Sequence, residues 1–241
     1  MTRCVKVYFF MELLVVVCSA CGGGGLGAPI PMKATTSAPK TVQITQWGDS
    51  TTDGWYKNSS GNYVKVPNRP WQLLQASLQS HFGPYVTVQL SAQEGSTLRD
   101  MLNGTGHFTE PLSLAIKADT SQVETIKFGL NDQGCYDAAT YQGYLIQAVQ
   151  IMLAAGKKVV LEEPNPALNY QYDKGLAIAT AVNQVAAQFS LPIVKSYSLT
   201  LAVPNWTKLM SDNLHPTQPL YQSISDEQIS VLVPIVQDLL K

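Results

Sequence analysis

Short runs of β-branched and aliphatic residues alternate with longer amphipathic stretches over most of the chain. The runs that predict strands are Val42–Trp47, Val86–Leu90, Val123–Gly129, Lys158–Glu162 and Leu191–Lys195. The stretches that predict helices are 71–82, 97–102, 111–117, 137–155, 170–189 and 217–240. Strands joined through helices of this length run parallel, with right-handed crossovers. The alternation therefore predicts an α/β fold, a doubly wound and mainly parallel five-stranded sheet with helices on both faces.

The first forty residues have a different character. Residues 1–20 carry Arg3 and Lys6, then an apolar run, then small residues, which is typical of a secretory signal. The run is too short for a permanent membrane span, and Glu12 is costly inside a bilayer. Residues 21–40 are rich in Gly, Pro, Ala and Thr and predict a flexible tether. We therefore expect one folded domain, over residues 41–241.

The cysteine at the end of the signal segment predicts a lipid anchor. Cys18-Ser19-Ala20-Cys21, followed by four glycines, resembles a bacterial lipobox, in which the cysteine after the cleavage site is lipidated. The resemblance implies that Cys21 ties the domain to a membrane of the bacterial cell envelope, facing the periplasm or the outside. With Gly22 after the anchor, the sequence resembles lipoproteins sent to the outer membrane, so we expect the outer rather than the inner membrane. Simple secretion, with Cys21 a free thiol, is the alternative.

Charge and the remaining cysteine and histidine residues exclude several classes of function. The chain has 16 Lys and Arg against 17 Asp and Glu, without a basic block, so we expect no nucleic-acid partner. With Cys21 lipidated, Cys135 has no disulfide partner, and we expect it to pack as a small apolar side chain. The histidines at 81, 107 and 215 have no partners at zinc-ligand spacing. We therefore expect a protein that works without a metal. A monomer is the default expectation, and we expect no cofactor.

Polar residues follow the predicted strands at the sheet edge where ligands bind in such folds. Gly48-Asp49-Ser50 follows the first strand, Gly95 the second and Asn131 the third. Near the last helix, Asp212 precedes His215 by three residues, a spacing that lets the carboxylate orient the ring as a general base. Each motif alone also fits an ordinary turn or helix cap. Their common place at one edge is what favours a catalytic interpretation.

Taken together, these motifs resemble the SGNH (GDSL-type) hydrolase family, from about Val42 to the last helix. The resemblance implies a flavodoxin-like fold in which Ser50 is the nucleophile, His215 the base and Asp212 its orienting acid. It also implies an oxyanion hole formed by the N–H groups of Ser50 and Gly95 and the amide of Asn131. The sequence departs from the family where Thr51 replaces the usual Leu, and the second motif lacks a clear Asn.

These residues predict a serine-dependent carboxylic ester hydrolase of the esterase or lipase type, acting in the cell envelope through an acyl-enzyme. The substrate is a lipid, an acetylated glycan or a small ester. One alternative is a carbohydrate O-acetylesterase acting on polysaccharide or peptidoglycan, and another is a non-catalytic binding lipoprotein.

Two further segments are candidates for the walls of the pocket. Trp55 and Tyr56 follow the serine motif, and residues 162–166 follow the fourth strand. The adjacent Glu162 and Glu163 point to opposite faces of an extended stretch, which argues against paired carboxylates of a glycosidase.

Overall fold

The structure is a computed structural model that describes residues 40–168 and 172–241. The predicted signal segment, the lipid-anchored Cys21 and all of the tether except Lys40 lie outside the described residues, so these features stay predictions. Within the described part of the chain, no helix has the length and apolar character needed to cross a membrane.

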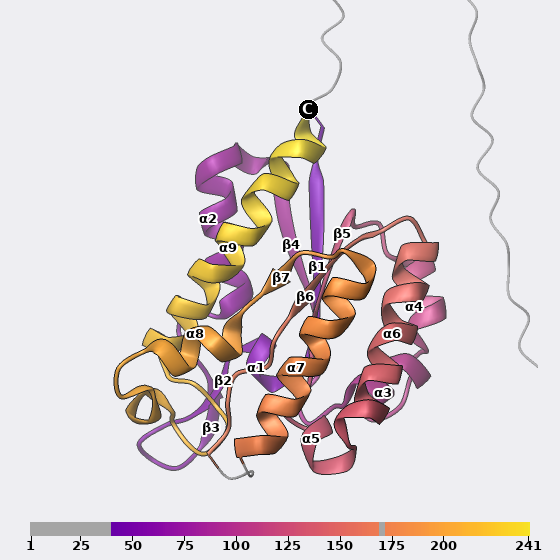
Figure 1. The fold of residues 1–241 in the computed structure, drawn as a ribbon. Helices are drawn as coiled ribbons and strands as arrows, with labels where there is room; N and C mark the ends of the chain where they lie inside the picture. The colour runs from indigo at the N-terminus through magenta and orange to yellow at the C-terminus, as the bar shows by residue number, and fades with distance from the viewer. Residues whose placement is uncertain (1–39, 169–171) are drawn as a thin grey trace, which may run out of the picture. The chain divides into compact units, whose positions relative to one another are not determined.

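A five-stranded sheet lies at the centre of the fold, and all its pairings are parallel (Figure 1). Its strands are β1 (Val42–Gly48), β4 (Val86–Ala92), β5 (Val123–Lys127), β6 (Lys158–Glu162) and β7 (Ile193–Val194). Their spatial order is β4-β1-β5-β6-β7, the flavodoxin-like order, which reverses its direction of winding between β1 and β5. The predicted α/β fold is confirmed, although β5 and β7 are shorter than expected.

Helices cover both faces of this sheet (Figure 1). One face carries α2 (Pro70–Phe82) and α9 (Gln218–Leu240). The other carries α3 (Leu98–Asn103), α4 (Leu112–Ala118), α6 (Ala138–Ala154) and α7 (Tyr172–Phe189). All six match predicted helices to within two residues at each end.

The two faces arise from the alternation of side chains along each strand. In β6, Val160 packs with Leu74 of α2 and Leu232 of α9 in one buried cluster. Its neighbours Val159 and Leu161 belong to a second buried cluster with the helices of the opposite face. Because both faces are covered, the strands read as nearly continuous apolar runs, and this made them recognisable in the sequence.

Several short elements were not predicted. They are α1 (Ser50–Asp53), α5 (Asp132–Cys135), α8 (Ser196–Ala202), the 3₁₀ turns Gly83–Tyr85 and Trp206–Leu209, and an antiparallel hairpin of β2 (Trp55–Lys57) and β3 (Tyr63–Lys65). None exceeds seven residues, too few to establish a hydrophobic period. Two of them, α1 and the hairpin, directly follow β1 and lie at the site described below.

A buried ion pair connects the carboxyl ends of β5 and β6. Lys127 Nζ lies 2.9 Å from Glu162 Oε1, and both side chains are at most 2% exposed. Glu162 also accepts hydrogen bonds from Ser196 Oγ of α8 (2.8 Å) and Gln228 Nε2 of α9 (2.6 Å). This network therefore fixes two strands and two helices relative to one another.

Removing the cation of this pair is expected to destabilise the fold strongly. Lys127→Met leaves Glu162 buried without its counter-ion, which typically costs about 3–5 kcal/mol of unfolding free energy. Lys195→Met is the matched control, because the Lys195 side chain is 43% exposed and its Nζ lies 3.8 Å from Glu163 Oε1. An exposed pair of this kind contributes less than about 1 kcal/mol. Urea denaturation followed by tryptophan fluorescence measures both, and equal losses in the two variants would contradict this assignment.

Candidate active site

Ser50 is the first residue of α1 and lies directly beyond the end of β1. Asp49 caps this helix, since its Oδ1 accepts hydrogen bonds from the Thr51 N–H and the Thr51 hydroxyl, both at 2.8 Å. Asp49 and Thr51 are buried, whereas Ser50 is partly exposed. The helix cap, Asp49, and the predicted nucleophile, Ser50, are thus neighbouring residues of one motif. Because Asp49 is buried, it holds Ser50 at the edge of the sheet.

The glycine that precedes this cap is required by close packing. A Cβ on Gly48 would lie 2.0 Å from Thr52 Oγ1 and 2.8 Å from the Lys127 carbonyl oxygen. Any larger residue would therefore push α1 away from the end of β5. Gly48 lets the serine turn approach the neighbouring strand.

Ser50, His215 and Asp212 form a continuous hydrogen-bonded chain. Ser50 Oγ lies 2.9 Å from His215 Nε2, although 165 positions separate the two residues in sequence. On the other side of the ring, His215 Nδ1 lies 2.9 Å from Asp212 Oδ2. The spacing of three residues works because Asp212 Oδ1 also accepts the backbone N–H groups of Leu214 (2.7 Å) and His215 (2.6 Å). The turn is folded around the carboxylate.

These hydrogen bonds also determine the charge of Asp212. Partial burial acts to raise its pKa, but bonds from the backbone and ring of His215 and from the Leu214 N–H outweigh burial and lower the pKa below its ordinary value. Asp212 is therefore ionised at neutral pH. An ionised carboxylate at Nδ1 keeps the proton on that nitrogen and leaves Nε2 facing Ser50 as an acceptor.

The loops after β4 and β5 bring Gly95 and Asn131 to the same pocket as Ser50 and His215. Gly95 has φ of +70°, a conformation that favours glycine, although a Cβ there would contact nothing within 4 Å. Asn131 Nδ2 donates one hydrogen bond to the Ser96 carbonyl oxygen (2.9 Å), which orients the amide. Within residues 40–168 and 172–241, the backbone N–H groups of Ser50 and Gly95 have no hydrogen-bond partner. Both are available to a ligand.

The pocket beside Ser50 is small, about 240 Å³. Its remaining walls are Trp55, Tyr63, Glu94 and Leu214. Trp55 was predicted to line it, but Tyr56 is not among the lining residues. Tyr63 and Leu214 were missed, because nothing in their local sequence marks a pocket.

The prediction that residues 162–166 form a pocket wall is wrong. Glu162 lies in the buried network with Lys127, and Glu163 accepts hydrogen bonds from Asn183 Nδ2 (2.7 Å) and the Tyr197 N–H (3.0 Å). The stretch instead supports the catalytic loop, since Asn165 Nδ2 donates to the Leu214 carbonyl oxygen (3.0 Å). The two glutamates are both occupied inside the fold and form no pair across the pocket.

Asp132 lies in α5, one residue beyond Asn131, and is fully buried. Its Oδ1 accepts the Leu98 N–H at the start of α3 (3.0 Å), whereas Oδ2 has no partner among the described residues. Burial, aided by the negative charge of Asp49, raises the pKa of Asp132 to about 7. At neutral pH the carboxyl group therefore connects α5 to α3 partly in its protonated and partly in its ionised form.

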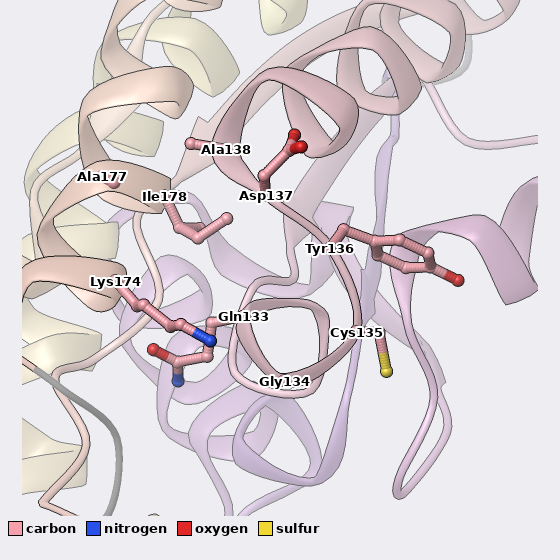
Figure 2. A pocket seen from close by; sticks show the side chains of 9 residues that line it. All are labelled: Gln133, Gly134, Cys135, Tyr136, Asp137, Ala138, Lys174, Ala177 and Ile178. Atoms are coloured by element: carbon pink, nitrogen blue, oxygen red, sulfur yellow. The ribbon is translucent and has the colours of Figure 1, made fainter.

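A second hollow, of about 370 Å³, lies between α5, the start of α6 and α7 (Figure 2). Figure 2 shows the side chains that line this hollow, among them Gln133 and Cys135 of α5 and Lys174 of α7. Ser50, Asp212 and His215 do not line it. Cys135 is exposed, so its predicted apolar packing is wrong. The described residues contain no group of His, Cys, Asp and Glu side chains suited to hold a metal ion.

The geometry agrees with comparisons to known proteins. The profile of the GDSL-like lipase/acylhydrolase family matches residues 47–222. A search of curated protein sequences finds no match. The family profile covers more than half of the chain, so the chain belongs to the GDSL-like lipase/acylhydrolase family and is an ester-bond hydrolase of the SGNH type.

Solved structures share the fold at low sequence identity. A lipase/acylhydrolase from Enterococcus faecalis is 19% identical with a TM-score of 0.67, and the match covers 81% of this chain and 97% of that one. A carbohydrate acetylesterase from Sinorhizobium meliloti is 13% identical, with a TM-score of 0.67 and coverage of 81% and 100%. An aryl esterase from M. smegmatis is 16% identical, with a TM-score of 0.65 and coverage of 83% and 100%. These neighbours establish the fold.

The raised pKa of Asp132 predicts a specific pH dependence of stability. The folded state holds the proton up to about pH 7, whereas the unfolded chain releases it near 3.8, so unfolding free energy falls as pH rises between these values. Asp132→Asn keeps the Leu98 hydrogen bond and cannot ionise. We expect it to gain stability relative to the native chain as pH rises from about 5 to about 8. The gain is about 1.4 kcal/mol for each pH unit over which only the folded chain keeps the proton.

Urea denaturation at both pH values measures this difference. Asp137→Asn is the control, because Asp137 is exposed and hydrogen bonds from Thr140 lower its pKa. Its carboxylate is ionised throughout this range in both states, so the variant should show no such gain. A constant difference between Asp132→Asn and the native chain would contradict the prediction.

Proposed function

We propose that Ser50, His215 and Asp212 are the catalytic residues of a two-step carboxylic ester hydrolysis. The observation that carries the proposal is the chain of two 2.9 Å contacts from Ser50 Oγ through the His215 ring to Asp212, opening onto a small pocket. Ser50 Oγ attacks the acyl carbon while its proton moves to His215 Nε2. Asp212 holds the ring and stabilises the imidazolium that results.

In the rest of the cycle, His215 first acts as an acid toward the leaving alcohol and then as a base toward water. The imidazolium returns its proton to the leaving alcohol as the ester C–O bond breaks, which leaves the acyl group on Ser50. Water then gives a proton to His215 Nε2 and attacks the acyl-enzyme, and the carboxylic acid leaves as Ser50 regains its proton. The chemistry requires no group beyond those that the chain supplies.

The oxyanion formed in both steps is stabilised by three donors. These are the N–H groups of Ser50 and Gly95 and the side-chain amide of Asn131. The first two have no hydrogen-bond partner in the described part of the chain, and the third is oriented by Ser96. Donors fixed before the reaction stabilise developing charge without a cost of reorganisation, and each typically contributes about 100-fold or more, about 2.7–4 kcal/mol, to turnover.

The dimensions of the pocket favour a short acyl group. A volume of about 240 Å³ accepts an acetyl group with part of an alcohol, but is small beside the roughly 300–1,000 Å³ of sites for larger ligands. Trp55 lines it and offers an aromatic face of the kind that packs against a sugar ring. This favours the alternative of a carbohydrate O-acetylesterase within the esterase class, and the fold is shared with a carbohydrate acetylesterase. A non-catalytic lipoprotein would have no use for the assembled triad.

Hydrolysis of p-nitrophenyl esters from acetate to palmitate tests this function. We expect the full-length chain in detergent to turn over acetate fastest, with rates that fall as the acyl chain lengthens, and Ser50→Ala to lose nearly all activity. Ser230→Ala, an exposed serine on α9, is the control and should match the native chain. A preference for long chains would overturn the short-acyl proposal. Activity that persists in Ser50→Ala would overturn the role of the serine.

We also propose that the enzyme acts as a lipoprotein of the cell envelope, anchored through Cys21. The support is the sequence Ser19-Ala20-Cys21-Gly22 behind an apolar segment, with a Gly-rich tether of a length that lets the domain reach substrates near the membrane. Both membrane esters and nearby glycans fall within that reach.

Metabolic labelling with a radioactive fatty acid tests the anchor. Expressed in bacteria, the full chain should take up label and sediment with membranes, whereas Cys21→Ser should do neither. Cys135→Ser is the control, because it removes the exposed thiol of the folded domain and should keep both properties. Label retained in Cys21→Ser, or lost in Cys135→Ser, would contradict the assignment.

A further inference from the structure

The hairpin β2–β3 carries its two lysines and its pocket-lining aromatic rings on the same face. In its antiparallel register Trp55 pairs with Lys65, and Lys57 pairs with Tyr63. Side chains alternate along a strand and directly paired residues point to the same side, so these four side chains share one face. Two of them, Trp55 and Tyr63, line the pocket beside Ser50. The lysines therefore lie on the face of the hairpin that forms the pocket wall.

Each lysine packs over one of these rings. Lys65 Nζ lies 5.3 Å from the centre of the Trp55 ring, and Lys57 Nζ lies 5.8 Å from the centre of the Tyr63 ring. At such distances the face of an aromatic ring attracts a cation. Tyr63 is 53% exposed, so its ring forms the outer part of the pocket wall. Lys57 thus places a positive charge at the mouth of the pocket.

The two lysines differ in whether an acidic residue neutralises their charge. Lys65 Nζ lies 2.7 Å from Oδ2 of Asp53, which is only 5% exposed and is also paired with Arg69. Lys57 is exposed, and in the part of the chain that the structure describes no carboxylate forms an ion pair with it. Lys57 is therefore a cation at the mouth of the pocket whose charge is open to a substrate.

The backbone of the hairpin is held in place beside the catalytic turn. The Lys57 N–H donates to Ser211 Oγ (3.0 Å), and the Ser211 hydroxyl in turn donates to the His215 carbonyl oxygen (3.0 Å). From α9, the Tyr221 hydroxyl donates to the Trp55 carbonyl oxygen (2.7 Å). The start of the Lys57 side chain is thus fixed relative to the groups proposed for the reaction.

A carboxylate on another wall gives the mouth of the pocket two charged sides. Glu94 is exposed and lines the pocket from the loop after β4, next to Gly95 of the proposed oxyanion hole. Its negative charge repels an anion from that wall, whereas Lys57 attracts one toward the hairpin. A short acyl group is taken up beside Ser50, so the alcohol is the part of the ester that reaches the mouth. The charge that fits the hairpin is an anion on this alcohol.

We propose that Lys57 is a specificity-determining residue that pairs with a carboxylate on the alcohol part of the ester. This inference rests on the proposed short-acyl hydrolase and names its substrate class, acetylated acidic sugars. A sugar ring that packs against the Tyr63 ring brings its carboxylate to the side on which Lys57 lies. An exposed ion pair of this kind strengthens binding about threefold.

Two acetate esters of the same shape but different charge test this preference. They are 4-acetoxybenzoate and 4-acetoxybenzamide, and the ratio of their kcat/KM values is measured for the full-length chain in non-ionic detergent. Lys57→Gln should lower this ratio about threefold by raising KM for the benzoate, and Lys57→Glu should lower it about tenfold. Turnover of the neutral benzamide should stay the same, whereas a general loss of the hairpin would lower both rates. Salt at about 0.5 M should weaken the native preference.

Lys158→Gln is the control for this measurement. Lys158 is exposed, begins β6 at the opposite edge of the sheet, and gives the same change in net charge. Its ratio should match that of the native chain. An unchanged ratio in Lys57→Gln, in an enzyme that Ser50→Ala inactivates, would overturn the proposal. A native chain without Ser50-dependent activity would instead overturn the proposed function.

Two further pairs of esters distinguish a sugar carboxylate from a phosphate. The first pair is an O-acetylated methyl glucuronoside and the matching methyl glucoside, and the second is monoacetylglycerol phosphate and monoacetylglycerol. We expect Lys57→Gln to reduce the preference for the glucuronoside over the glucoside. If it reduced only the preference for the phosphate, the assignment to acidic sugars would be overturned.

A binding measurement does not depend on activity. In Ser50→Ala, the inert amides 4-acetamidobenzoate and 4-acetamidobenzamide can be titrated against the indole N–H signal of Trp55 by NMR, with Trp55→Phe used to assign the signal. Adding Lys57→Gln should raise the Kd of the benzoate about threefold and leave that of the benzamide unchanged. A Kd of the benzoate that does not change, or that changes no more than that of the benzamide, would contradict the ion pair even in an inactive protein.

Discussion

The ion pair of Lys127 and Glu162 determines how the catalytic elements sit on the sheet. Through Ser196 and Gln228 it joins β5 and β6 to α8 and α9. The chain leaves β5 for Asn131, and α9 begins just after His215. A buried ion pair gives little net stability over an apolar pair, because both charges lose their hydration. Its hydrogen bonds are directional, however, and they fix one placement of these elements where apolar packing alone would allow several.

The positive charge of Lys127 also acts on Asp49, the residue that caps the helix of Ser50. Burial raises the pKa of Asp49, but the hydrogen bonds from Thr51 and the positive charge of Lys127 oppose this effect. Burial and the negative charge of Asp49 raise the pKa of Asp132 to about 7. The two buried acids therefore interact, and the charge of one makes it harder for the other to ionise.

The sequence predicted those parts of the structure that have a recognisable pattern, namely the strands, the long helices and the site motifs. The strands and long helices follow from hydrophobic period. Ser50, Gly95 and Asn131 follow from motifs after predicted strands, and Asp212 and His215 from their spacing just before the last helix. The sequence did not predict the hairpin β2–β3, because its strands have only three residues each and their side chains are half-buried or exposed. Tyr63 lies 13 positions from Ser50 in a segment without a period, so its contact with His215 arises only from tertiary folding. Residues 162–166 were placed at the correct edge, but burial of both glutamates turns the stretch inward.

The sheet carries the residues proposed for the chemical step, whereas the hairpin β2–β3 forms part of the pocket wall that a substrate would contact. The sheet and its motifs hold the residues that we propose as nucleophile, base and oxyanion donors, and solved structures described as a lipase/acylhydrolase, a carbohydrate acetylesterase and an aryl esterase share that fold. A common layout of this kind does not select a substrate. In this chain the pocket wall is the hairpin, whose Trp55 and Tyr63 line the cavity while its backbone and Tyr63 contact the catalytic turn. The wall that a substrate would meet therefore touches the same turn that carries Asp212 and His215.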